Sequence, residues 1–161
     1  MEFDGAGTFI GSSYLFTTAR NYARFGQLYL EDGMAAGRRL LPAGWVAWSR
    51  RATLGVGYGA GFWTNDGDGK IAARRVASGF PKDGFFASGN QGQRIYIVPS
   101  GGLVVARFGY SSGPDFGIDD DIALIAAALK THSAGKAVGV KSHRLGKRCY
   151  LPLSPTGLHR G

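Results

Sequence analysis

The run Asn90-Gln-Gly-Gln-Arg-Ile-Tyr-Ile-Val-Pro99 is followed, after Ser100-Gly-Gly102, by Leu103-Val-Val-Ala-Arg-Phe-Gly109. Both runs are apolar, and the short polar and glycine-rich segment between them is typical of a turn. The pattern therefore predicts a β-hairpin with strands at 94–99 and 103–108. A polar triplet, Asn90-Gln91-Gly92, leads into the first of these strands.

The remaining segments predict helices on either side of this hairpin in the sequence. Thr17-Thr18 is typical of a helix N-cap, and Asp32-Gly33 is typical of a helix end. Aspartates at 119–121 and Lys130 suit the two ends of a later helix. We also expect a short helix from Pro42 through Trp48, an extended connector at 37–41, strands at 58–64, 70–76 and 83–88, and a turn at 65–69. The fold class is α+β, with an antiparallel sheet flanked by helices.

Charge is distributed unevenly along the 161 residues, whose formal net charge is +8. Residues 1–129 hold 12 Lys/Arg and 11 Asp/Glu, whereas residues 130–161 hold 7 Lys/Arg and no acidic residue. We therefore divide the chain into a domain at 1–131 and a basic, disordered tail at 132–161. A basic tail is typical of an arm that contacts nucleic acid or anionic lipid, but also of a solvated terminus or an out-of-frame extension.

Several classes of site and segment are not predicted. The only cysteine is Cys149, so no internal disulfide is expected, and no apolar run has the length of a membrane span. All three histidines lie at or beyond His132, which leaves no Ser-His-Asp triad in the domain. The stretch from Thr64 to Arg75 imitates half of an EF-hand loop, but a turn is the better interpretation. We expect no metal and no cofactor, and the sequence leaves the compartment open.

A series of segments in a fixed order carries a resemblance to a known family. They are 7–20, Tyr22-Ala-Arg-Phe-Gly26, Leu40-Leu-Pro-Ala-Gly-Trp45, Tyr58-Gly-Ala-Gly-Phe-Trp63 and Gly92–Pro99. This series resembles the C-terminal half of the β-lactamase-related serine hydrolases, which include class C-like β-lactamases, small esterases and 6-aminohexanoate-oligomer hydrolases. The resemblance covers about residues 4–130 and implies part of a β-lactamase/transpeptidase-like fold.

The resemblance implies an acyl-enzyme mechanism on esters or amides. In the family, a Ser-x-x-Lys motif supplies the nucleophile, a Tyr-x-Asn-type motif assists proton transfer, and a Lys/His-x-Gly motif forms a wall of the oxyanion site. Only the third motif maps onto this chain, at Asn90-Gln91-Gly92, with Gln93 beside it. Asn90 stands where the family places lysine or histidine, and an asparagine carries hydrogen bonds but no charge. The alternative interpretation of the triplet is a polar entrance to a strand.

Three further residues, Ser12, Ser13 and Tyr14, are candidates for lining the cleft, although a helix-entry loop whose hydroxyls satisfy backbone groups is the simpler explanation. The one Ser-x-x-Lys in the chain, Ser133–Lys136, follows the last predicted helix, and we interpret it as coincidence.

These observations predict a fragment of a serine hydrolase that is inactive alone, because the nucleophile motif does not precede the wall motif. The small ester or amide substrate then belongs to the full-length relative. We also expect self-association through a sheet face left exposed by missing elements. The alternative function is a non-catalytic binding module whose basic tail contacts nucleic acid or another acidic partner.

Overall fold

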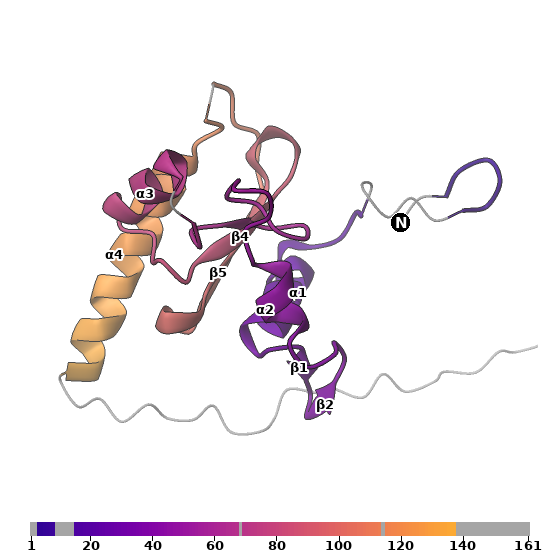
Figure 1. Cartoon of the computed structure of the whole chain (residues 1–161), viewed down its shortest axis with the longest axis horizontal. Coiled ribbons are helices and arrows are strands. Elements are labelled where there is room, and N and C mark those ends of the chain that lie inside the picture. The colour runs from indigo at the N-terminus through magenta and orange to yellow at the C-terminus, as the bar shows by residue number, and fades with distance from the viewer. Residues whose placement is uncertain (1–2, 9–14, 68, 114, 138–161) are drawn as a thin grey trace, which may run out of the picture.

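The computed structural model describes residues 3–8, 15–67, 69–113 and 115–137, and its elements are shown in Figure 1. The helices are α1 (Ala19–Leu30), α2 (Trp45–Ser49), α3 (Lys70–Ala77) and α4 (Ile118–Ala137). The strands are β1 (Met34–Ala35), β2 (Arg38–Arg39), β3 (Trp63–Thr64), β4 (Phe85–Ser88), β5 (Arg94–Val98) and β6 (Leu103–Arg107). The described residues therefore form an α+β structure, as the sequence predicted.

The main sheet is antiparallel, in the order β3-β4-β5-β6, and β1 and β2 form a separate two-stranded hairpin. The predicted hairpin is confirmed as β5 and β6, with Tyr96 opposite Val105 at its centre. A short 3-10 turn over Pro99–Gly101 joins the two strands, and Gly102 closes it in the left-handed conformation.

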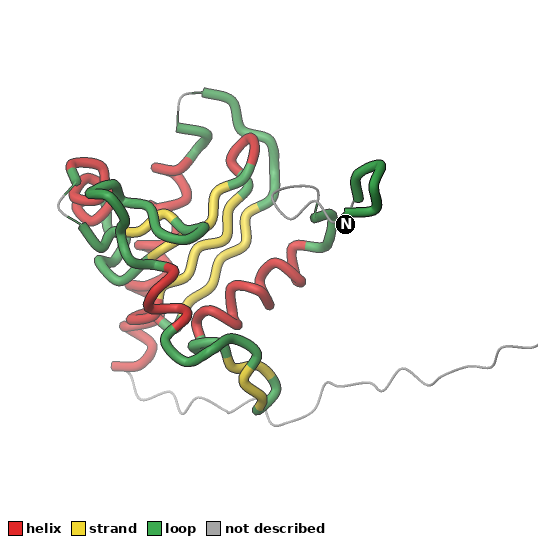
Figure 2. The backbone as a smooth tube through the Cα atoms, turned by 45° about the vertical axis from the view of Figure 1, so that its right-hand side comes forward, coloured by secondary structure: helices red, strands yellow, loops and turns green. Residues whose placement is uncertain are grey.

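Helices cover both faces of this sheet, as Figures 1 and 2 show. The side chains of β5 alternate between the two layers, because successive residues of a strand point to opposite faces. Tyr96 and Val98 pack in a cluster with Ile122 and Ile125 of α4. Ile95 and Ile97 pack in a second cluster, which includes Val46 of α2 and partly buried residues of α1. The expected exposed sheet face is therefore absent from the described residues.

The start of one helix agrees with the prediction, and the start of another does not. The Oγ1 atom of Thr18 accepts a hydrogen bond from the Asn21 N–H at 3.3 Å, which confirms the predicted N-cap of α1. By contrast, α2 begins at Trp45 rather than at Pro42. The connector expected at 37–41 contains β2, because Ala36 and Gly37 both adopt positive φ and form the tight turn of the β1–β2 hairpin.

Two strand predictions were wrong. Residues 70–76 form a helix, α3, because alanine and arginine favour helix and because Ala72 and Arg75, three residues apart, share its buried face. Of residues 58–64, only Trp63–Thr64 joins the main sheet. Tyr58 instead bridges back to Trp63, so the glycine-rich segment between them folds on itself.

The last helix is longer than predicted. α4 runs to Ala137 and so continues past Thr131, where the composition changes, and past Lys130, where we expected the helix to end. The rest of the basic tail, 138–161, lies outside the described residues. Within the described residues, no helix combines the length and the hydropathy that a transmembrane segment requires.

Candidate functional site: the Asn90–Gly92 turn

The triplet singled out by the sequence forms a short turn, Asn90–Gly92, between β4 and β5. Gln91 has φ 58° and ψ 29°, and Gly92 has φ +85°, so two successive residues adopt the left-handed region. A Cβ atom on Gly92 would lie 2.6 Å from the Phe116 carbonyl oxygen. Only glycine fits this position without displacing its neighbours.

Arg107, at the end of β6, hydrogen-bonds the backbone of this turn. Its Nη1 donates to the Gly92 carbonyl oxygen at 2.5 Å, and its Nη2 donates to the Ser111 Oγ. The Ser111 backbone N–H in turn donates to the Gln91 carbonyl oxygen at 3.1 Å. Two consecutive carbonyl groups of the turn are therefore fixed, one by β6 and one by the loop that follows it.

A buried ionic cluster lies behind this contact. The Asp121 carboxylate of α4 pairs with Arg94 at 3.0 Å and with Arg107 at 3.1 Å, and it accepts a hydrogen bond from the Tyr96 hydroxyl at 2.7 Å. The side chains of Arg94 and Asp121 are only 4% and 11% exposed. One carboxylate thus links β5, β6 and α4 beneath the turn.

Arg94 extends the cluster to the loop before α4. Its guanidinium donates to the backbone oxygens of Phe116 at 2.9 Å and Asp115 at 3.0 Å. Its Nε atom is buried and has no hydrogen-bond partner in the described part of the chain. Burial, and then the hydrogen bond to Asp121, raise the pKa of Tyr96 well above its ordinary value of about 10, so its hydroxyl stays a donor.

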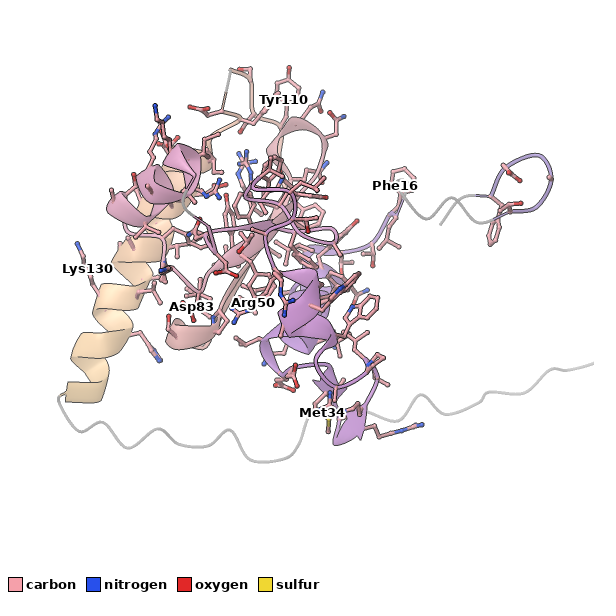
Figure 3. All side chains as sticks on the ribbon, viewed as in Figure 1. Phe16, Met34, Arg50, Asp83, Tyr110 and Lys130 are labelled. Carbon is pink, nitrogen blue, oxygen red and sulfur yellow. The ribbon has the colours of Figure 1, made fainter. Side chains whose placement is uncertain are left out.

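The predicted site residues separate into two groups. Asn90, Gln91 and Gln93 are exposed around the turn, whereas Gly92 is buried within it. The exposed side chain of Tyr110 projects from the neighbouring loop after β6, as Figure 3 shows. The other predicted group, Ser12, Ser13 and Tyr14, lies outside the described residues.

The sequence did not identify the residues that support the turn. Arg94 and Arg107 lie at the ends of apolar strands and appeared to be ordinary polar boundaries, and Asp121 was assigned to the dipole of a helix. One signal was available: Arg94 alternates with Tyr96 and Val98, which places its side chain on a buried face and demands a partner.

A second buried arginine, Arg75 of α3, lies away from the turn. Its Nε donates to the Asn65 Oδ1 at 2.8 Å, its Nη2 donates to the Thr64 carbonyl oxygen at 2.8 Å, and its guanidinium lies 5.3 Å from the centre of the Phe86 ring. Burial lowers the pKa of this guanidinium from its ordinary value. These contacts attach α3 to β3 and β4, and their role is structural.

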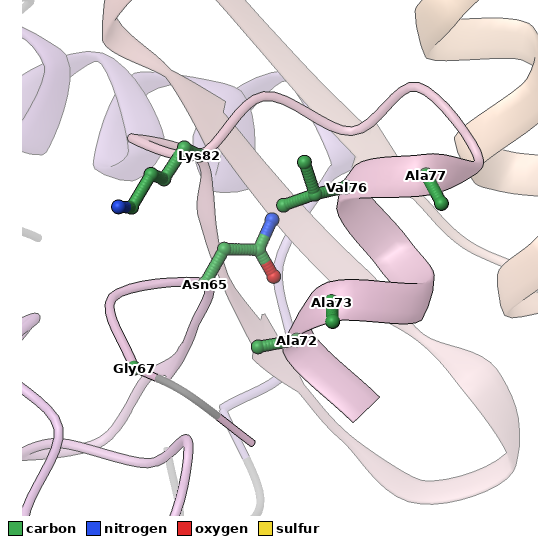
Figure 4. Close-up of a pocket in the computed structure, with 7 residues that line it drawn as sticks. All are labelled: Asn65, Gly67, Ala72, Ala73, Val76, Ala77 and Lys82. Carbon is green, nitrogen blue, oxygen red and sulfur yellow. The ribbon is translucent and has the colours of Figure 1, made fainter. Parts of the chain in front are cut away.

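A shallow pocket of about 340 Å³ opens between α3 and the preceding turn, as Figure 4 shows. Asn65 lines it, but both ends of its amide are already used. Its Oδ1 accepts from Arg75, and its Nδ2 donates to the Pro81 carbonyl oxygen at 3.0 Å. The other lining residues are Gly67, Ala72, Ala73, Val76, Ala77 and Lys82. This pocket offers a ligand little beyond an apolar wall and one amine.

The glycine-rich segment before β3 has a packing role. A Cβ atom on Gly59 would lie 2.2 Å from the Ser49 carbonyl oxygen, so this glycine allows the backbone of the segment to pack against the end of α2. No cluster of three or more His, Cys, Asp or Glu side chains arranged for a metal occurs in the part of the chain that the structure describes.

Comparison with known proteins adds no assignment. No protein-family model matches the chain, and no curated protein sequence matches it. The turn presents neutral amide side chains on a backbone fixed by Arg107 and by the Ser111 N–H, an arrangement suited to hydrogen-bonding a carbonyl or an oxyanion.

Proposed function

We propose that this chain forms one wall of the catalytic cleft of a β-lactamase-related serine hydrolase that cleaves esters or amides through an acyl-enzyme. The wall is the Asn90–Gly92 turn, and the 161 residues alone are inactive. The observation that carries the proposal is the support of this turn: Arg107 fixes the Gly92 carbonyl group, and Ser111 fixes that of Gln91.

Fixed geometry is what an oxyanion site requires. Donors stabilise developing charge best when they are positioned before the reaction and do not have to reorganise during it. The buried Asp121 cluster supplies such fixation, because it ties the two strands and the helix behind the turn to one carboxylate. An ordinary polar strand entrance on the surface needs no such support.

The position of Ser133–Lys136 supports the view that this chain lacks its own nucleophile. Both residues belong to α4, whose first turn carries Asp121 beneath the wall. At about 1.5 Å per residue, Ser133 lies about 18 Å farther along the helix axis than Asp121. A serine that attacks a carbonyl held at the wall must approach within about 3–3.5 Å of the reacting atom.

The proposal is tested with a fluorophosphonate probe, which labels activated serines covalently. We expect no labelling of the 161-residue chain. We expect labelling of a longer product of the same reading frame, at a serine upstream of the present Met1. In that product, replacing Gly92 with alanine should displace the wall, because the added Cβ atom would lie 2.6 Å from the Phe116 carbonyl oxygen. We expect kcat to fall about 10²–10³-fold, as it does when one oxyanion donor is lost. Labelling of the 161-residue chain itself, or full activity of the Gly92→Ala variant, would contradict the proposal.

A second function is favoured by a different observation, the charge of the C-terminal segment. Residues 138–161 contain Lys141, Arg144, Lys147, Arg148 and Arg160 and no acidic residue. As a binding module, the chain would hold nucleic acid or another polyanion through this segment, with an affinity that falls steeply with salt. Truncation after Ala137 leaves α4 intact and should abolish that binding. Salt-insensitive binding, or binding retained by the truncated chain, would contradict this second function.

A further inference from the structure

The β6 strand forms an edge of the main sheet. Among the described residues, only β5 pairs with it. All five residues of β6 are half-exposed, and the strand contains no proline or lysine, with a single charge at its end, Arg107. Natural edge strands usually carry proline, lysine or a bulge, which prevents pairing with another chain. The opposite edge, β3, is only two residues long.

The two faces of β6 are already covered near this edge. Gly26 of α1 lies so close to Val104 that a Cβ atom on it would be 2.6 Å from the Val104 Cγ1. On the other face, Leu103 and Val105 pack against the cluster that includes α4. Both faces of β6 are therefore packed against apolar side chains, so a strand that continues the sheet beside it must itself be apolar on both sides.

Aromatic side chains lie beside the same edge. Phe108, the residue after β6, is 40% exposed, and its ring centre lies 4.8 Å from that of Tyr22 on α1. These rings enlarge the apolar surface available to a partner beyond the strand itself.

We propose that β6 pairs with β6 of a second copy of this chain, antiparallel, around a two-fold axis through Val105. Only this register overlaps all five residues of both strands. It places Val105 opposite Val105 of the partner protomer and Leu103 opposite the partner's Arg107, so no like charges face each other. In this register, two apolar strands of equal length pair, and no like charges lie opposite each other. This proposal does not depend on the proposed hydrolase function.

Hydrogen exchange and sedimentation test the pairing directly. As concentration rises, the mass should increase from 17.1 kDa to about twice that value, and amide protection should increase within 103–107. The other edge, Trp63–Thr64, is the internal control and should not change. Higher salt should favour the dimer, because it screens repulsion between the two positively charged chains. A monomer at every concentration, or protection that does not depend on concentration, would overturn the proposal.

Cysteine cross-linking tests the register. Directly opposite residues bring Cβ atoms within about 4.5–5.5 Å, near the reach of a disulfide. In a Cys149→Ser background, Val105→Cys should give an oxidised dimer. Leu103→Cys, on the same face, is the matched control and should not, because its opposite residue is the partner's Arg107. Circular dichroism confirms that both variants fold. Equal cross-linking of the two variants, or none in either, would overturn the proposed register.

Discussion

The contribution of the Asp121 carboxylate to the stability of this fold can be tested with a single substitution. Replacing Asp121 with alanine removes the partner of Arg94, of Arg107 and of the Tyr96 hydroxyl in one step. Two guanidinium groups, one of them 4% exposed, then face each other without a counter-charge. Removing one member of a buried ion pair costs about 3–5 kcal/mol, and we expect this range for Asp121→Ala.

The matched control is Asp120→Ala, which removes an exposed carboxylate from the same turn of α4. It should cost less than about 1 kcal/mol, the usual value of a charge near a helix N-terminus. Urea unfolding measures both free energies. Thermal melting should show Tm roughly 9–15 °C lower for Asp121→Ala, at about 3 °C per kcal/mol. If the two variants differ by less than about 1 kcal/mol, the cluster does not hold the structure together as we describe.

Three further predictions concern other parts of the core. Arg75→Ala should lower the free energy of unfolding in urea by about 2–4 kcal/mol, because it leaves buried acceptors without a donor. Arg74→Ala breaks only exposed ion pairs, with Asp115 and Asp119, and should cost less than about 1 kcal/mol. Equal costs would contradict the assignment of Arg75. Tyr96→Phe should cost about 1–2 kcal/mol at pH 7. The folded protein keeps this hydroxyl protonated, whereas the tyrosine of the unfolded chain ionises above about pH 10. Above that pH, the unfolding free energy of the wild type should therefore fall by up to about 1.4 kcal/mol per pH unit relative to that of Tyr96→Phe. Parallel plots of unfolding free energy against pH for the two proteins would contradict the raised pKa. Gly26→Ala should destabilise the fold by about 1–3 kcal/mol despite the better helix propensity of alanine, because the added Cβ atom collides with Val104. Val104→Ala should therefore cost less in the Gly26→Ala background than in the wild type. Strictly additive costs would exclude this collision.

Local signals in the sequence predicted the parts of the fold that depend on neighbouring residues. The cap at Thr18 and the β5–β6 hairpin are encoded within a few residues of each other, and both are confirmed. The strand predicted at 70–76 was wrong because the prediction did not weigh the helix propensity of its alanines and arginines, and because the burial of Arg75 against β3 is a long-range contact. Short apolar runs do not distinguish strand from helix by themselves.

The candidate site was predicted only in its exposed part. Asn90-Gln91-Gly92 was visible as a polar triplet before a strand, and the structure places it in a turn. Strand alternation indicated that Arg94 is buried and needs a partner, but it did not identify that partner. Arg94 and Asp121 are far apart in the sequence and meet only when α4 packs on the sheet. A charge at a helix N-terminus has a local explanation in the dipole, which hid the long-range role of Asp121.

The central claim, that the Asn90–Gly92 turn is a wall of a serine-hydrolase cleft, is tested most directly by the coding DNA upstream of Met1. We expect an in-frame extension that encodes Ser-x-x-Lys and, after it, a Tyr-x-Asn-type motif, because the wall needs a nucleophile and a proton-transfer group opposite it. An in-frame stop codon directly upstream, with a ribosome-binding site before Met1, would contradict the claim and leave the basic C-terminal segment as the functional part of the chain.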